Sequence, residues 1–174
     1  LGDHPDANEA DSKRLHELAA GAEQAEKDLH RSFFKKWDID ATGAKSMPHT
    51  LLYTSYMVRI VSTRPYAEGL AVLLPCFWVY MHVGQCMLKL RAEMDEDVVT
   101  LERNSQYDAW IDMYGGEDFE REVKDYIGIV DRVTQGVDEE TKNRMNEHFV
   151  MSCKLEHMFW DQAQTMMDWP ESIK

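Results

Sequence analysis

Cys76 is the first residue of this chain whose type and position suggest chemistry. It directly follows Pro75 and lies four residues before Tyr80 in an apolar stretch. If a helix restarts at Pro75, the thiol lies in its first turn, where the helix dipole and the free N–H groups lower a thiol pKa. Tyr80 then lies one turn away on the same face, so that a soft nucleophile and a proton-exchanging phenol line one pocket. The alternative is that Cys76 is a small buried hydrophobic residue, which is more common for cysteine in an apolar helix.

Glu156 is the second candidate, because its carboxyl group interrupts the mostly apolar segment MSCKLEHMFWDQA. The carboxylate lies either at the rim of the fold, which is the more common position for glutamate, or in a dry cavity. In a cavity, desolvation raises the carboxyl pKa and suits the group to general acid–base catalysis. The remaining cysteines and a set of aromatic residues are interpreted as packing residues: Cys86, Cys153, Tyr53, Tyr107, Trp110 and Tyr114.

The motifs of several other kinds of site do not occur in the sequence. It contains no glycine-rich phosphate loop, no paired CxxC, no HExxH and no histidine three residues after a glutamate. Zinc, nucleotide and di-iron sites therefore have no motif here, and we expect neither a metal nor a cofactor. No two of the seven histidines have a ligand spacing with a third ligand in reach, and we interpret them as surface or packing residues: His4, His16, His30, His49, His82, His148 and His157.

Apolar residues three or four positions apart predict helices over most of the chain, and no alternating strand pattern occurs. Pro75 either kinks the third of these helices or begins a new one. The predicted helices span residues 11–37 and 48–62, then one that opens at Pro65 and runs into an acidic helix end and connector at 93–104, then one that holds 107–114 with Ser105 as N-cap, then 117–133 ending at Gly136, and 139–167 with Asp138 as N-cap; 37–49 is a loop. The fold class is therefore an all-α bundle of six or seven helices.

Composition limits the partners. The 174 residues include 19 Lys and Arg against 32 Asp and Glu, a net charge of −13, which argues against a nucleic-acid partner. Three cysteines are too few for a disulfide framework and indicate a reducing, cytoplasmic compartment. Residues 69–88 carry no formal charge and are long enough to span a bilayer, but their proline, histidine and glutamine favour the buried central helix of a bundle, with no membrane partner.

Three segments, in this order and on predicted helices, resemble the TenA/THI-4 family, the thiaminase II enzymes. They are LLPCFWVYMHVG at 73–84, YDAWIDMY at 107–114 and LEHMFW at 155–160, and the resemblance covers about residues 26–163. It implies a haem-oxygenase-like helical bundle, usually a homotetramer, whose cavity holds an aminopyrimidine without metal or haem. Members with the helical cysteine are aminopyrimidine aminohydrolases. They hydrolyse degraded thiamin, such as aminomethylpyrimidine, to hydroxymethylpyrimidine for salvage.

The resemblance also assigns roles to residues of this chain. It makes Cys76 the nucleophile and Glu156 the acid/base that hydrogen-bonds the pyrimidine. Addition of the thiolate breaks the aromaticity of the ring and lets the group on the exocyclic methylene depart, while the carboxylic acid supplies a proton to a ring nitrogen. The residues that would orient the thiol and the ring, line the cavity or stack on the substrate are Tyr53, Tyr80, Tyr114 and Phe159.

One feature of the family is missing from the sequence. Its members begin with two further helices that carry a Gln-Asp pair, and only the dipeptide Asp161-Gln162, in the wrong order and place, comes near it. The chain also starts at Leu1 rather than Met, and we expect residues 1–174 to form one helical domain that is incomplete at its N-terminus. Two alternatives remain: a non-catalytic aminopyrimidine or thiamin binder, and a helical scaffold whose acidic surface binds partner proteins.

Overall fold

The fold is built of α-helices. The structure, a computed structural model, describes residues 1–96 and 107–170, and these residues form helices but no strand. The helices are α1 (Glu9–Trp37), α2 (Pro48–Thr63), α3 (Tyr66–Glu96), α4 (Asp108–Gly115), α5 (Glu117–Gln135) and α6 (Glu139–Thr165). The all-α prediction is confirmed. The predicted Ser105 cap and most of the acidic connector lie outside the described residues.

Local signals in the sequence account for most helix ends. The side chain of Asp138 accepts a hydrogen bond from the backbone N–H of Thr141 at 2.7 Å, as expected of an N-cap. At the start of α1, Asn8 caps in the same way and accepts from the N–H of Asp11 at 2.9 Å. Gly136 ends α5, and a proline occupies the first turn of α2. The bounds of α1, α2, α5 and α6 agree with the predicted ones to within two residues, and α3 begins one residue after the predicted Pro65.

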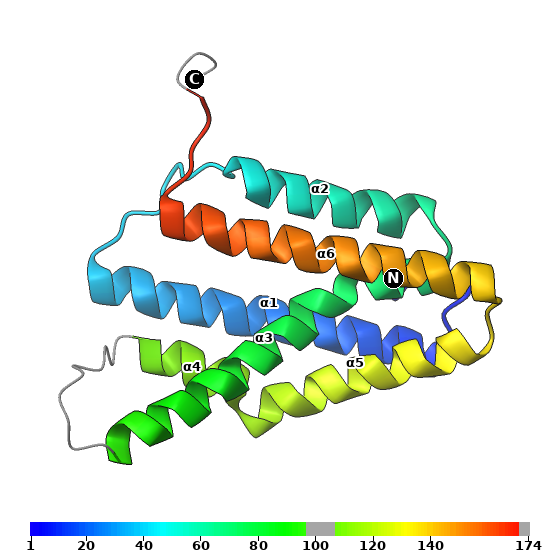
Figure 1. The fold of residues 1–174 in the computed structure, drawn as a ribbon, viewed down its shortest axis with the longest axis horizontal. Coiled ribbons are helices and arrows are strands. Elements are labelled where there is room, and N and C mark those ends of the chain that lie inside the picture. Colours follow the sequence, from blue (N-terminus) through cyan, green and yellow to red (C-terminus); the bar gives the residue numbers. More distant parts are fainter. Residues whose placement is uncertain (97–106, 171–174) are drawn as a thin grey trace.

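Helix α3 crosses the bundle diagonally and packs against α2, α4, α5 and α6 (Figure 1). Helices α2 and α6 lie side by side and also contact each other, whereas α1 makes fewer contacts with the other helices. Residues from α2, α4, α5 and α6 therefore face the same central helix. A side chain on α3 can meet groups that are far away in the sequence.

Pro75 does not begin a new helix. It lies inside α3, which runs unbroken through it, so the second of the two possibilities that the sequence left open does not occur. Proline has no N–H and leaves one carbonyl of the preceding turn without its helical partner. Side chains from other helices bind the carbonyls next to this gap: the Tyr126 hydroxyl donates to Leu70 O at 3.0 Å, and the Ser152 hydroxyl donates to Val72 O at 2.8 Å. These bonds attach α3 to α5 and α6 on both sides of the carbonyl of Ala71, which the proline leaves without its helical partner.

Residues Tyr66–Met94 of α3 are long and apolar enough to cross a membrane by length and composition, with a mean hydropathy of 1.5. The core helix of a soluble protein passes the same test. The first half of α3 is buried by the other helices, with Leu70 and Val72 at 0% exposure. The structure therefore fits the interpretation of α3 as the core helix of the bundle.

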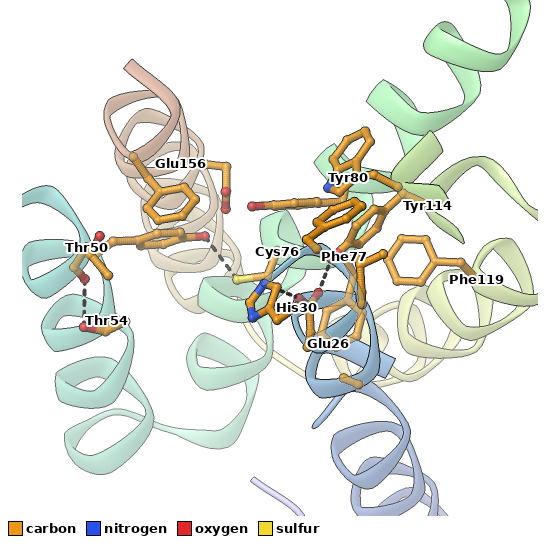
Figure 2. A pocket seen from close by; sticks show the side chains of 16 residues that line it. Glu26, His30, Thr50, Thr54, Cys76, Phe77, Tyr80, Tyr114, Phe119 and Glu156 are labelled. Carbon is orange, nitrogen blue, oxygen red and sulfur yellow. Dashed lines mark hydrogen bonds and ion pairs between the residues drawn. The ribbon is translucent and has the colours of Figure 1, made fainter. Parts of the chain in front are cut away.

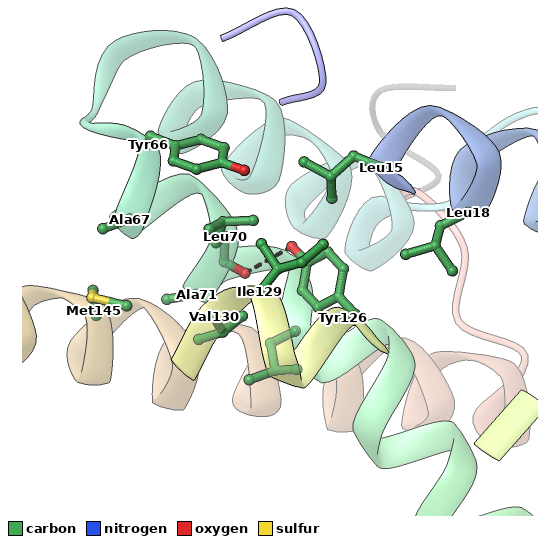
Figure 3. Packing of buried hydrophobic residues seen from close by; sticks show 11 residues of the cluster. Leu15, Leu18, Tyr66, Ala67, Leu70, Ala71, Tyr126, Ile129, Val130 and Met145 are labelled. Atoms are coloured by element: carbon green, nitrogen blue, oxygen red, sulfur yellow. Dashed lines mark hydrogen bonds between the residues drawn. The ribbon is translucent and has the colours of Figure 1, made fainter. Parts of the chain in front are cut away.

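The apolar core lies where α1, α3, α5 and α6 meet (Figure 3). Tyr126 fills its centre and stacks on Phe77 with ring centroids 4.8 Å apart. The core residues are Leu15, Leu18, Tyr66, Ala67, Leu70, Ala71, Leu74, Tyr126, Ile129, Val130 and Met145. Phe77 lies between this core and the pocket described below, so packing in the core supports one wall of the pocket.

A buried ionic cluster connects α2, α3 and α6. Glu68 is 1% exposed and accepts hydrogen bonds from Arg144 Nε at 2.7 Å and His148 Nε2 at 3.0 Å. The other ring nitrogen of His148 lies 2.7 Å from the Tyr56 hydroxyl. Burial raises the pKa of Glu68, but the hydrogen bonds and charge interactions with Arg144 and His148 outweigh burial and lower the pKa below its usual value. The buried carboxylate is thus compensated by charge and hydrogen bonds.

Gly84 allows α4 to lie directly against α3. A Cβ atom at this position would lie 2.5 Å from the backbone nitrogen of Gly115 and in collision with the backbone of Tyr114. The contacted atoms belong to backbone that is packed in α4, so no side chain can move aside to make room. This close approach brings Tyr114 next to the side chains of α3.

We expect Gly84→Ala to lower the free energy of unfolding by about 1–3 kcal/mol, because the added methyl group forces α3 and α4 apart. Urea denaturation measures this change. The matched control is Gly128→Ala in α5, where the nearest atom to a new Cβ is Arg132 Nη1 at an ordinary 3.5 Å. Gly128→Ala raises stability by up to about 1 kcal/mol through helix propensity. Equal effects of the two substitutions would contradict the close packing of α3 and α4.

Candidate active site

One pocket opens between the helices and has a cavity volume of about 540 Å³ (Figure 2). This volume lies within the range of roughly 300–1,000 Å³ that is usual for small-molecule sites. All six residues that the sequence analysis assigned to a site line it: Cys76, Glu156, Tyr53, Tyr80, Tyr114 and Phe159. They come from α2, α3, α4 and α6. The fold thus brings together side chains that are up to 106 positions apart, from Tyr53 to Phe159.

Cys76 faces the pocket from the interior of α3. Its sulfur lies 3.2 Å from the Tyr53 hydroxyl of α2 and 3.5 Å from the sulfur of Met57. Burial raises the pKa of the Cys76 thiol to about 11, and the negative charge of Glu156 acts in the same direction, while the hydrogen bond with Tyr53 lowers it. The low pKa that a helix restart at Pro75 would give does not occur, because α3 continues through Pro75 and offers the sulfur no free N–H groups.

Glu156 lies in the pocket and not at an exposed rim. It belongs to α6 and is 3% exposed. Burial raises the pKa of its carboxyl group, and hydrogen bonds with Tyr53, Tyr80 and Trp160 reduce this effect without reversing it. Of the two positions that the sequence left open for Glu156, a rim or a cavity, the structure shows the cavity. A carboxyl group with a raised pKa can hold a proton nearer to neutral pH and return it during a reaction.

Tyr53 connects the thiol and the carboxyl group. Its hydroxyl is hydrogen-bonded to Cys76 and to Glu156, and its side chain is buried at 5% exposure. Burial raises the pKa of Tyr53 far above its usual value, and the negative charges of Cys76 and Glu156 add to the increase. The phenol therefore stays protonated and can pass a proton between its two neighbours.

A group of aromatic rings forms the wall of the pocket on α3 and α4. The ring centroid of Tyr114 lies 5.0 Å from that of Tyr80, 4.7 Å from that of Trp110 and 5.1 Å from that of Phe119. Trp160 Nε1 also donates a hydrogen bond to the Tyr80 hydroxyl at 3.3 Å. Trp110 lines this pocket, although the sequence analysis interpreted it only as a packing residue. Sequence alone gave no signal that distinguished it from the other aromatic residues.

Tyr107 and Tyr114 occupy different environments. Tyr114 is 5% exposed and lines the pocket, whereas Tyr107 is 53% exposed and packs against Trp37 with ring centroids 6.0 Å apart. The placement of Tyr114 in the cavity, which the resemblance implied, agrees with this geometry. The two tyrosines are seven residues apart at the ends of one short segment, so the orientation of α4 decides which of them enters the pocket.

Gln162 is a buried residue that the sequence analysis did not identify as important for the pocket. Its Oε1 accepts a hydrogen bond from the backbone N–H of His49 at 2.6 Å, and its Nε2 donates to Thr50 Oγ1 at 3.0 Å. Helix α2 has Met47 at its N-cap, whose side chain offers no hydrogen bond. Gln162 therefore caps α2 from α6 and holds the helix that carries Tyr53. No sequence pattern identifies a cap that comes from 113 residues away.

The described residues contain no group of three or more His, Cys, Asp or Glu side chains that could hold a metal ion. His49 and His148 have hydrogen-bond partners within the fold. The chemistry that the pocket can offer comes from its own side chains: a thiol, a phenol and a carboxyl group in a chain of hydrogen bonds.

Comparisons with known proteins agree with the fold. A sequence profile of the TENA/THI-4/PQQC family, a family with a haem-oxygenase-like helical fold, matches residues 5–166. An aminopyrimidine aminohydrolase of Bacillus subtilis is 33% identical over 162 residues, which are 91% of this chain and 64% of that protein. An aminopyrimidine aminohydrolase of Halalkalibacterium halodurans is 28% identical over 162 residues, 91% of this chain and 66% of its own length. This chain thus spans slightly less than two thirds of both relatives.

A third relative is much longer. The thiamine biosynthesis multifunctional protein ThiED of Corynebacterium efficiens is 26% identical over 151 residues, which are 87% of this chain and 19% of that protein. The matched region therefore occurs both in shorter proteins and within a multifunctional one.

The raised pKa of Cys76 predicts slow alkylation of this thiol. With a pKa of about 11, only about one thiol in a thousand is ionised at pH 8, so its reaction with iodoacetamide rises with pH up to about pH 11. Tyr53→Phe slows the reaction further, because it removes the hydrogen bond that lowers the pKa. Mass spectrometry of the modified peptides measures the rates, with the exposed Cys86 as the internal control. Faster alkylation of Cys76 than of Cys86 at pH 7 would contradict the prediction.

The capping role of Gln162 predicts a stability loss that is specific to this side chain. We expect Gln162→Met to lower the free energy of unfolding by about 1–3 kcal/mol, because it leaves the His49 N–H without a partner. Gln164→Met, at an exposed position on the same helix, is the control and changes stability by less than about 0.5 kcal/mol. Urea denaturation compares the two variants, and a neutral Gln162→Met would rule out the cap.

Proposed function

The chain belongs to the TENA/THI-4/PQQC family, and we propose that it is a hydrolase of C–N bonds, an aminopyrimidine aminohydrolase of the thiaminase II type. The proposed reaction converts degraded thiamin, such as aminomethylpyrimidine, to hydroxymethylpyrimidine for thiamin salvage. The observation that carries this proposal is the meeting of Cys76 and Glu156 in one pocket, with Tyr53 hydrogen-bonded to both. The relatives from Bacillus subtilis and Halalkalibacterium halodurans, both named aminopyrimidine aminohydrolase, support the same activity.

In the first proposed step, the sulfur of Cys76 adds to an electron-poor carbon of the pyrimidine ring. The thiol has a pKa of about 11, so it must give up its proton as the bond forms. Tyr53 takes this proton and passes one to Glu156, whose carboxyl group protonates a ring nitrogen. One S–C bond forms and one N–H bond forms, and the ring loses its aromaticity.

In the second proposed step, the electron pair of the ring expels the amine from the exocyclic methylene group. Water adds to the methylene carbon, the C–O bond of the hydroxymethyl product forms, and the expelled amine takes the proton that the water gives up. The S–C bond then breaks and restores the aromatic ring, and the proton on the ring nitrogen returns through Glu156 and Tyr53 to the thiol. The net reaction exchanges an amine for a hydroxyl group and needs only water.

The aromatic residues of the pocket have roles in binding under this proposal. Phe159 stacks against the ring plane, Tyr80 orients the ring through the hydrogen-bond chain with Glu156, and Tyr114 lines the opposite wall. Burial raises the pKa of Tyr80 and of Tyr114 well above the usual value, so both act as neutral hydroxyl groups. Neutral phenols can donate hydrogen bonds to ring nitrogens or accept them from amino groups.

The proposal also includes a cytoplasmic, homotetrameric protein that binds a small aminopyrimidine. Exposed apolar side chains on the outer face of α2 support association between copies. They are Leu51, Leu52 and Val58, with 46%, 48% and 64% exposure.

The reaction is tested by incubating the purified chain with 4-amino-5-aminomethyl-2-methylpyrimidine and measuring the hydroxymethyl product by chromatography. We expect Cys76→Ala to abolish turnover and Glu156→Gln to reduce kcat by about 10²–10⁴-fold, because each variant removes one end of the proton chain. Cys86→Ala, at an exposed position outside the pocket, is the control and retains activity. Full activity of Cys76→Ala would remove the nucleophile from the proposal, and binding without turnover in the unmodified chain would favour a non-catalytic binder.

A further inference from the structure

The pocket has a second carboxyl group, which the proposed reaction does not use. Glu26 lies on α1 and lines the pocket, and it accepts a hydrogen bond from the hydroxyl of Tyr114 (Figure 2). Its other oxygen lies 3.4 Å from Nε2 of His30, one turn further along α1. The side chain of Glu26 is 42% exposed, so its carboxylate lies at the open side of the pocket.

Aromatic rings lie next to this carboxylate. Tyr114, whose hydroxyl donates to Glu26, packs against Trp110 at 4.7 Å and Phe119 at 5.1 Å between ring centroids. All three side chains line the pocket. Aromatic faces carry negative electrostatic potential and attract cations within about 6 Å, and such groups of rings bind ammonium and quaternary nitrogen groups in other proteins. A carboxylate beside the rings adds a negative charge to the negative potential of their faces, and so strengthens the attraction of a cation.

The electrostatic character of the pocket agrees with a preference for cations. Among the described residues that line it, no lysine or arginine occurs, and the acidic residues are Glu26 and Glu156. Burial of Glu156 favours its neutral form, whereas Glu26 lies nearer to solvent. A phosphate group in this pocket would meet a carboxylate with no lysine or arginine to compensate it, which is unfavourable.

The size of the pocket leaves room for a charged substituent. Its volume of about 540 Å³ lies in the range that holds ligands larger than a single six-membered ring. With the pyrimidine between Cys76 and Glu156, the side of the pocket formed by α1 and α4 remains for the group on the exocyclic methylene.

We propose that Glu26 and the rings of Trp110, Tyr114 and Phe119 form a cation subsite, which binds a positively charged group on the exocyclic methylene of the aminopyrimidine. The group is an ammonium or an N-alkylated heteroaromatic ring. The subsite selects these substrates over neutral analogues and over phosphate esters. This inference rests on the proposed function, because it takes the pyrimidine to lie beside Cys76.

Two ligands of nearly equal size test the subsite: 4-amino-5-aminomethyl-2-methylpyrimidine, which carries an ammonium group, and its neutral 5-hydroxymethyl analogue. Calorimetry at pH 8 and low salt measures their Kd values in the full chain with Cys76→Ala, which prevents turnover. Glu26→Gln removes the charge but keeps an oxygen that can accept the hydrogen bond of Tyr114. Glu23→Gln, one turn earlier on α1 and 67% exposed, changes the net charge equally and is the matched control.

We expect the ammonium ligand to bind about fivefold or more tightly than the hydroxymethyl ligand, a typical gain for a cation against aromatic faces. Glu26→Gln brings the ratio of the two Kd values to within about twofold of one, mainly by weakening the binding of the ammonium ligand. Glu23→Gln leaves the ratio of Kd values unchanged. Circular dichroism confirms that each variant is folded.

An unchanged ratio in Glu26→Gln, or an equal loss in Glu23→Gln, would overturn the subsite while leaving the proposed function intact. Failure of both ligands to bind the parent protein would overturn the proposed function together with the subsite. Tighter binding of a phosphate ester of the hydroxymethyl ligand than of the ligand itself would also overturn the preference for cations.

Discussion

The pocket depends on one buried contact: the Tyr53 hydroxyl lies 3.2 Å from the Cys76 sulfur and is also hydrogen-bonded to Glu156. These three groups come from α2, α3 and α6, and each is polar in a largely apolar environment. Burial opposes ionisation of both the thiol and the carboxyl group, so the resting pocket favours protons on its own side chains. A site of this kind does not rely on a stable thiolate. Under the proposed function, the proton leaves the sulfur only when a ring is present to accept the new bond.

The rest of the fold holds these three helices in place through polar contacts between distant residues. Gln162 caps α2 from α6, and the Glu68 cluster connects the opposite ends of α2, α3 and α6. Gly84 lets α4 approach α3, which sets the position of Tyr114. The position of Tyr114 in turn brings its hydroxyl to Glu26 on α1, and both side chains line the pocket.

Much of the fold could be predicted, because helix formation depends on neighbouring residues. The Asp138 cap, the stop at Gly136 and the start at Pro48 are local signals, and each lies where it was expected. At Pro75 the sequence left a kink or a new helix open, and tertiary contacts decided against a new helix. Tyr126 and Ser152, far away in the sequence, bind carbonyls near the proline and support an unbroken helix. The low thiol pKa that a new helix start would give is therefore absent, and burial raises the pKa instead.

The sequence by itself determined which residues form helices and which few side chains carry unusual chemistry, because periodicity, capping and residue type can be recognised within a short segment. It also carried the family resemblance that grouped Cys76 with Glu156. Only the tertiary structure decided that the Cys76 pKa rises to about 11, that Trp110 faces the pocket and Tyr107 does not, and that Glu26 adds a second carboxylate. The burial of a side chain and the electrostatic potential at its atoms depend on groups from several helices. A local stretch of sequence does not contain this information.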